Sequence, residues 1–169
     1  MQDFVHLHVH TQYSLLDGQA SVARLVDKAM KNGMKGIAVT DHGNMFGIKE
    51  FTNYVNKKNS GPKGEIKDLK KRIAGIEAGT VECEDKEAEI AACKAKIVEA
   101  ENKLFKPIIG CEMYVARRTM DLKEGKPDQS GYHLIVLAKN EKGYHNLIKL
   151  VSHAWTRGYY MRPRTDRSE

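Results

Sequence analysis

The chain has 169 residues, 41% of them hydrophobic and 30% charged, which is the composition of an ordinary globular domain with its own core. No apolar run approaches the roughly 20 residues that span a bilayer, and the first residues lack the pattern of a secretory signal. Its three cysteines indicate neither a disulfide framework nor a zinc finger, so we expect a cytoplasmic protein without membrane contact. The net charge of +6 is compatible with nucleic acid but does not establish it.

The first predicted element is a strand over residues 4–10, in which polar and apolar side chains alternate. His6, His8 and His10 share one face of this strand. Such a face is costly to bury unless the rings are hydrogen-bonded or bind metal. Core histidines or an exposed edge strand are the plain alternatives, but three alternating imidazoles favour a metal site.

A loop over residues 11–20 follows and contains Asp17-Gly18, which is either an ordinary turn or a source of a further metal ligand. Ser21 is expected to cap a helix with one buried stripe, and residues 36–40 read as a short buried strand. A second helix is predicted from about Met45. Strand and helix alternate, which predicts parallel strands covered by helices, as in a doubly wound sheet or a barrel.

Residues from about 60 to 105 differ from their surroundings, because they are highly charged and carry apolar residues at spacings of three and four. This pattern predicts two helices packed against each other in an antiparallel hairpin. We expect the hairpin to be an insertion in the α/β domain, serving as a solvated spacer or a docking surface for a protein.

The α/β pattern resumes with strands over residues 108–115 and 133–138. Asn140 then caps a helix whose stripe, from Tyr144 to Trp155, is predicted to face the core. The segment over residues 158–164 is irregular and basic.

The candidate ligands lie where parallel strands end. His8 and His10 are at the carboxyl end of the first strand and His42 is at the end of the next, which is the end that carries the site in parallel α/β proteins. Asp17 can reach the same place. Glu112 lies in an apolar strand, where it either bridges metal ions or is salt-bridged or exposed.

We expect the other histidines and several arginines to have supporting or surface roles and not to bind the metal. His133 begins its strand, so a parallel arrangement places it at the opposite end of the sheet, in a structural hydrogen bond. His6 is expected to support the site, and His145 and His153 to be surface or packing residues. Basic side chains near the later strands could contact phosphates or be solvated; they are Arg117, Arg118, Arg162, Arg164 and Arg167.

Mixed histidine and carboxylate sites suit zinc or manganese, and clustered divalent ions favour hydrolysis of phosphate esters. The sequence contains none of the motifs GxxxxGK[ST], GxSxG or GxGxxG. The P-loop, serine-hydrolase and dinucleotide-binding classes are therefore excluded.

Several strings resemble a known family. Residues 4–18 resemble the first motif of the polymerase and histidinol phosphatase (PHP) superfamily, and residues 38–47 are similar to its second motif, in the form typical of bacterial DNA polymerase III alpha subunits. Three further strings are similar to those subunits in the same order; they are residues 106–112, 133–140 and 158–164.

This resemblance implies a distorted β/α barrel with up to three metal ions, bound by His8, His10, Asp17, His42 and Glu112. It further implies metal-dependent 3′–5′ exonuclease activity, in a DNA-directed DNA polymerase whose own polymerase region, a nucleotidyltransferase, uses magnesium. DNA and other replicase subunits are the implied partners.

The chain departs from the family in its hairpin and in its end at Glu169, so we interpret residues 1–169 as part of a PHP-like domain, with an incomplete metal site, and expect this part to have neither polymerase nor phosphoesterase activity of its own. A free-standing phosphatase for a small ester, like histidinol phosphatase, is the main alternative. A catalytically silent scaffold is another. The string Asn44-Met-Phe-Gly47 and the basic segment over residues 158–164 favour the polymerase.

Overall fold

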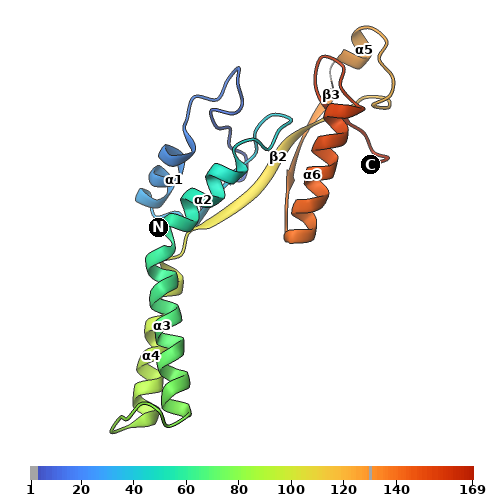
Figure 1. Cartoon of the computed structure of the whole chain (residues 1–169). Helices are drawn as coiled ribbons and strands as arrows, with labels where there is room; N and C mark the ends of the chain where they lie inside the picture. Colours follow the sequence, from blue (N-terminus) through green and yellow to red (C-terminus); the bar gives the residue numbers. More distant parts are fainter. Residues whose placement is uncertain (1–3, 130) are drawn as a thin grey trace. The chain divides into compact units, whose positions relative to one another are not determined.

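A computed structural model describes residues 4–129 and 131–169 (Figure 1). The chain divides into two compact units. The first unit contains the segments up to Tyr54 and from Lys106 onwards, and the second is Val55–Phe105. In the described part of the chain, no helix has both the length and the apolar character needed to cross a membrane.

The first unit is built on a four-stranded sheet with the order β1-β2-β3, in which β4 also pairs with β2. Both β1 and β4 run parallel to β2, whereas β3 runs antiparallel to it. The strand bounds are Gly36–Val39 for β1, Lys106–Ala116 for β2, Gly131–Leu137 for β3 and Arg164–Thr165 for β4. The predicted α/β class is confirmed at this level, and the barrel stays a prediction.

The helices associated with this sheet are α1 (Val22–Lys31), α2 (Ile48–Lys58), α5 (Lys126–Gln129) and α6 (Glu141–Thr156). Two predicted caps are confirmed: the Ser21 side chain accepts a hydrogen bond from the Arg24 amide, and Asn140 accepts one from the Gly143 amide. Helix α2 begins three residues later than the sequence predicted.

The two faces of β2 have different environments, as alternation along a strand requires. Cys111 and Met113 point to one face and pack against α6. Glu112 lies between them in the chain and therefore points to the other face. The predicted α6 stripe is wrong at Ile148 and Trp155, which are 37% and 43% exposed because they lie at the edge of the buried stripe.

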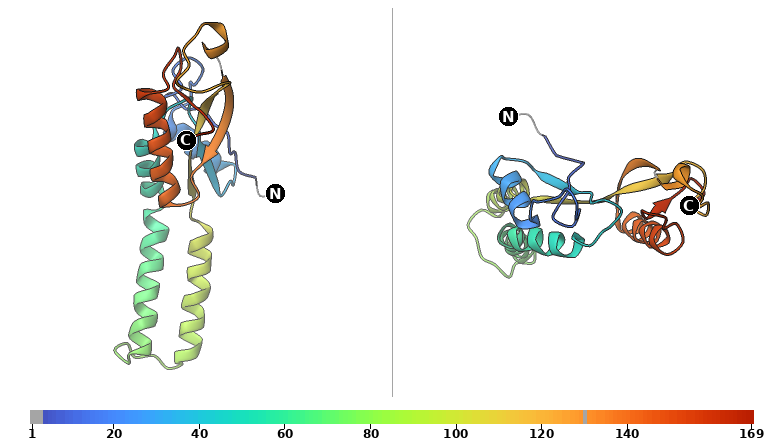
Figure 2. Two further views of the ribbon diagram at one scale, coloured as in Figure 1. Left: turned by 90° about the vertical axis from the view of Figure 1, so that its right-hand side faces the viewer. Right: turned by 90° about the horizontal axis from the view of Figure 1, so that it is seen from above.

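The second unit consists mainly of α3 (Ser60–Glu77) and α4 (Lys86–Asn102), which lie side by side and run in opposite directions (Figure 2). Four apolar residues of the two helices are buried, whereas the other residues of the predicted seams are only partly buried; the buried ones are Ile76, Cys93, Ile97 and Ala100. Asn59 precedes α3 and Phe105 follows α4. The Asn59 side chain donates to the Phe105 carbonyl at 2.8 Å and accepts from the Phe105 amide at 2.9 Å, which joins the two ends of the helix pair. That this pair is an insertion stays a prediction.

Residues 4–10 do not form the regular strand that the alternation predicted. The Ala38 amide donates to the His6 carbonyl and the Thr40 amide to the Val9 carbonyl, so three residues of this segment lie beside two of β1. The extra residue interrupts the ladder as a bulge does, and the Thr40 hydroxyl accepts the hydrogen bond from the Val9 amide. Leu7, on the predicted apolar face, remains 50% exposed, whereas Val5 and Val9 are partly buried.

The expectation of parallel strands is wrong for β3. A parallel return usually runs through a helix that crosses the sheet, whereas the described connection between β2 and β3 contains only the four-residue α5. The chain therefore turns back, and Tyr114 pairs with His133.

Candidate metal centre

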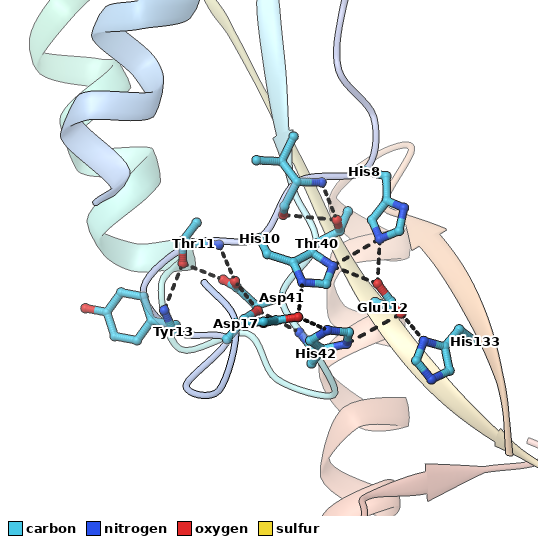
Figure 3. Close-up of polar contacts among 12 residues, drawn as sticks. His8, His10, Thr11, Tyr13, Asp17, Thr40, Asp41, His42, Glu112 and His133 are labelled. Carbon is cyan, nitrogen blue, oxygen red and sulfur yellow. Dashed lines mark hydrogen bonds and ion pairs between the residues drawn. The ribbon is translucent and has the colours of Figure 1, made fainter. Parts of the chain in front are cut away.

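All five predicted ligands meet at one place, and a sixth residue joins them (Figure 3). Three overlapping groups of side chains have ligand atoms within 4.8 Å of one another. We call these six residues the metal centre; they are His8, His10, Asp17, His42, Glu112 and His133.

Strand pairing brings His42 and Glu112 together. Gly36 pairs with Lys106 and Val39 with Ile109, and His42 forms a parallel bridge with Glu112 in the same register. The Glu112 amide donates to the Asp41 carbonyl at 3.1 Å, and the Gly43 amide donates to the Glu112 carbonyl at 2.8 Å. Backbone hydrogen bonds thus hold the two side chains next to each other.

Gly43 allows the chain to turn directly after His42. Its φ of 59° lies in the left-handed region that side chains disfavour, and a Cβ atom there would come within 2.6 Å of Pro163.

Three imidazoles surround the buried Glu112 carboxylate. The Nε2 atoms of His8 and His10 lie 2.5 and 2.7 Å from Glu112 Oε2, and 3.0 Å from each other. His133 Nδ1 contacts the other carboxylate oxygen. Glu112 is 2% exposed, so burial of this charge depends on these partners.

The fourth imidazole, His42, connects Glu112 to Asp17. Its Nε2 atom lies 2.9 Å from Asp17 Oδ2, which is also 3.5 Å from His10 Nδ1. The other ring nitrogen, His42 Nδ1, is buried without a hydrogen-bond partner and lies 3.5 Å from Glu112 Oε1.

The loop that carries Asp17 is fastened to the end of β1 by Asp41. The buried Asp41 carboxylate accepts hydrogen bonds from the Thr11 amide at 2.6 Å, the Thr11 hydroxyl at 2.8 Å and the Ser14 hydroxyl at 2.7 Å. Sequence reasoning missed this role. Its signal is a carboxylate at a strand end together with hydroxyl residues in the preceding loop.

Tyr114 supports two of the imidazoles. Its ring stacks on His42 with centroids 5.9 Å apart and meets His133 edge-on at 5.0 Å. The Arg162 guanidinium lies 4.9 Å from the centroid of the same ring. Burial raises the pKa of the Tyr114 hydroxyl, so it stays protonated at neutral pH.

The carboxylates of the centre stay ionised. Burial acts to raise the pKa of Glu112, but hydrogen bonds from His8, His10 and His133 outweigh it and hold that pKa below its usual value. The hydrogen bond from His42 similarly lowers the pKa of Asp17. Ionised carboxylates and neutral imidazoles are the forms that bind divalent cations.

The donor set fits divalent metal ions. One buried carboxylate is shared by several imidazoles, and His42 Nδ1 has no hydrogen-bond partner among the residues that the structure describes. Carboxylate oxygens combined with imidazole nitrogens are ligands that zinc and manganese accept.

Two expectations need correction. His133 does not lie at the opposite end of the sheet, because the antiparallel direction of β3 brings it to Glu112. Arg164 is not available to phosphates, because it is 1% exposed and its guanidinium donates to backbone carbonyls. His6 stands outside the metal centre, with its ring edge-on to Phe4.

The fold and the site define an α/β protein with a mixed histidine and carboxylate centre. The family model described as "PHP domain" matches residues 6–169, and the chain belongs to this family. The predicted relationship to bacterial DNA polymerase III alpha subunits is also confirmed.

Three relatives carry the name DNA polymerase III subunit alpha. The chain is 40% identical to the protein of Borreliella burgdorferi over 169 residues and 40% identical to that of Treponema pallidum over 164 residues. It is 33% identical to the Aquifex aeolicus protein over 171 residues. These matches cover 96–98% of the chain but only 10–11% of each relative.

Proposed function

We propose that this chain is the metal-binding phosphoesterase domain of a bacterial replicative DNA polymerase alpha subunit. The metal centre would hold zinc or manganese through His8, His10, Asp17, His42 and Glu112, with up to three ions in the whole domain. The observation that carries the proposal is the buried Glu112 carboxylate, shared among imidazoles from three separate segments of the chain.

Bound divalent ions supply Lewis-acid activation of water and stabilise charge on phosphoryl oxygens. The residues of the chain have separate tasks. Glu112 and Asp17 provide negative charge, and the paired backbones of β1 and β2 fix the positions of His42 and Glu112. Asp41 holds the Asp17 loop against the end of β1. Such fixed donors favour hydrolysis of a phosphate ester over mere metal storage.

The antiparallel β3 extends the proposed ligand set to His133. Its Nδ1 atom contacts Glu112 directly, so it either binds metal or orients the carboxylate. Either role places it in the site rather than in the distant structural bond that the sequence suggested.

We infer from the relatives that the parent protein is a DNA-directed DNA polymerase that acts on DNA together with other replicase subunits. A 3′–5′ exonuclease reaction is then the natural use of the centre. We also infer that residues 60–105 form an insertion in a barrel-like PHP domain.

The test is the metal content of the whole parent protein, measured by elemental analysis, together with its hydrolysis of end-labelled single-stranded DNA and of a small phosphate monoester. We expect bound divalent metal and release of nucleotides from DNA. The double variant His8→Ala plus His10→Ala should lose both properties.

His145→Ala plus His153→Ala is the matched control, because it removes the same number of imidazoles from α6, outside the metal centre. Loss of metal from this control would contradict the assignment. A metal-free wild-type protein would support the scaffold alternative, and hydrolysis of the small ester without hydrolysis of DNA would support the phosphatase alternative.

A further inference from the structure

A cleft of about 760 Å³ adjoins the metal centre, because Asp17 and His42 are among its lining residues. Several aromatic side chains also line it. Three of them form what we call the aromatic wall; they are Phe46, Trp155 and Tyr159.

The aromatic wall presents flat apolar surface to solvent. Phe46 is 62% exposed, Trp155 43% and Tyr159 48%. Large apolar side chains gathered on the surface of a cleft mark a binding site more often than isolated ones do. The same cleft is also lined by Leu16, which is fully exposed, so this face as a whole lacks a partner within the described residues.

Two rings of the aromatic wall are stacked, and the third lies at a tilt beside Trp155. Trp155 and Tyr159 have centroids 5.6 Å apart and planes only 19° from parallel, and Phe46 lies 6.4 Å from Trp155. The Trp155 indole donates a hydrogen bond to the Gly43 carbonyl at 2.7 Å. Because Gly43 directly follows His42, this bond fixes the aromatic wall relative to the metal centre.

The cleft is also lined by a positively charged residue and by a residue with a strained backbone. Arg162 lines the cleft with its guanidinium over the Tyr114 ring. The neighbouring Met161 also lines it, and its φ of 61° lies in the left-handed region although it is not glycine. Backbone strain of this kind is concentrated at functional sites.

A ligand that matches these features carries a flat ring next to an anionic group, as a nucleotide does. We propose that the aromatic wall is a base-stacking subsite for single-stranded DNA, which receives the base of a nucleotide whose phosphate lies at the metal centre. The inference rests on the proposed function and gives that site its substrate class. Every base has a flat face to stack, so the subsite accepts all four bases.

The chain offers a direct test, because Trp155 is its only tryptophan. The 169-residue chain is titrated with a short oligothymidylate and with an abasic oligonucleotide of the same number of phosphates, while tryptophan fluorescence is recorded. We expect quenching by the oligothymidylate, since its bases stack beside the indole, and little quenching by the abasic strand.

Tyr159→Ala keeps the fluorescent Trp155 and removes the ring that stacks on it. We expect this variant to bind oligothymidylate about 5- to 150-fold more weakly than the wild type does. Phe46→Ala should act in the same direction. Tyr144→Ala is the matched control: it removes a tyrosine from the first turn of α6, outside the cleft, and should leave binding unchanged. Far-UV circular dichroism verifies that each variant is folded.

Equal quenching by the abasic strand, or equal binding by the Tyr159→Ala and Tyr144→Ala variants, overturns the subsite even if the protein hydrolyses DNA. Failure of the proposed function looks different. In that case the whole parent protein binds no metal and its PHP domain cleaves no DNA. The base-dependent quenching is nevertheless expected to persist there, and also in the His8→Ala plus His10→Ala variant.

Discussion

Arg164 is the largest fully buried side chain in the described residues, and it is bonded entirely to main chain. Its guanidinium donates to the carbonyls of Gly158, Asp128, Met120 and Leu122 at 2.8–3.1 Å. One side chain thereby ties the loop after β2 to the segment after α6. A charge-assisted fork of this kind requires the planar geometry of arginine.

Arg164→Lys should therefore be strongly destabilising, although it retains the charge. The ammonium group cannot reach all these carbonyls, so buried acceptors are left unsatisfied, at a cost of about 3 kcal/mol or more. Urea unfolding measures the loss. Arg167→Lys, at an exposed position nearby, should change the free energy of unfolding little, and equal effects of the two substitutions would contradict this role.

The pKa of Asp128 links this region to pH. Its buried carboxylate accepts hydrogen bonds from Arg118, which hold the pKa below the usual value of an aspartic acid. A carboxyl with a lowered pKa in the folded protein adds stability above its unfolded pKa, and this stability is lost as the pH falls through the folded value.

We accordingly expect the stability difference between wild type and Asp128→Asn to be largest near neutral pH and to shrink below about pH 4. Urea unfolding over a pH series, in the presence of a chelator, follows this difference. Glu124→Gln is the control, because Glu124 also pairs with Arg118 but is exposed. A difference that grows on acidification would refute the assignment.

At the scale of elements, sequence predicts best what local signals determine. The caps at Ser21 and Asn140 are local, because each side chain bonds an amide three residues on. The seam of α3 and α4 is also local, since the spacing of apolar residues fixes which side each helix buries. The bulged segment beside β1 and the direction of β3 depend on distant partners, so alternation and strand order alone misjudged them.

In the candidate site too, the residues with local sequence signals were proposed, and those whose position depends on distant partners were not. His8 and His10 were proposed from their alternation, and His42 and Glu112 from a strand end and an apolar strand; the structure brings all four together, and their binding of metal stays a prediction. The position of His133 was predicted wrongly because it depends on the direction of β3. The connection through α5 contains no helix long enough to cross the sheet, so β3 runs antiparallel to β2. Asp41 was missed because its signal joins a carboxylate at a strand end to hydroxyl residues in a loop that is distant in the sequence.

The second unit should be dispensable for metal binding. All residues of the metal centre lie in the first unit, and Asn59 and Phe105 meet through two hydrogen bonds at the base of the helix pair. We expect a chain in which a short glycine-rich linker replaces residues 60–104 to bind the same number of metal ions, as measured by elemental analysis.

The control for this deletion combines it with His8→Ala and His10→Ala, and this combined variant should be metal-free. A folded deletion variant that binds no metal would contradict the prediction that the second unit is dispensable for metal binding.

For the whole molecule, metal should act as a stabilising ligand. A cation that binds only the folded chain adds about 2.7 kcal/mol at a hundredfold excess over its dissociation constant. Thermal unfolding should therefore shift to lower temperature when a chelator is added to the wild type. The His8→Ala plus His10→Ala variant should show a much smaller shift, and shifts of equal size would count against metal binding at this centre.

The bridge between His42 and Glu112 has a consequence for how such domains change over evolutionary time. The bonds that hold these positions together run between backbone amides and carbonyls, from Glu112 to Asp41 and from Gly43 to Glu112. They persist whatever side chains occupy the two ligand positions. A lineage can therefore exchange these side chains one by one while keeping the pocket they line, so the architecture can outlast the proposed metal binding and be recruited to new uses.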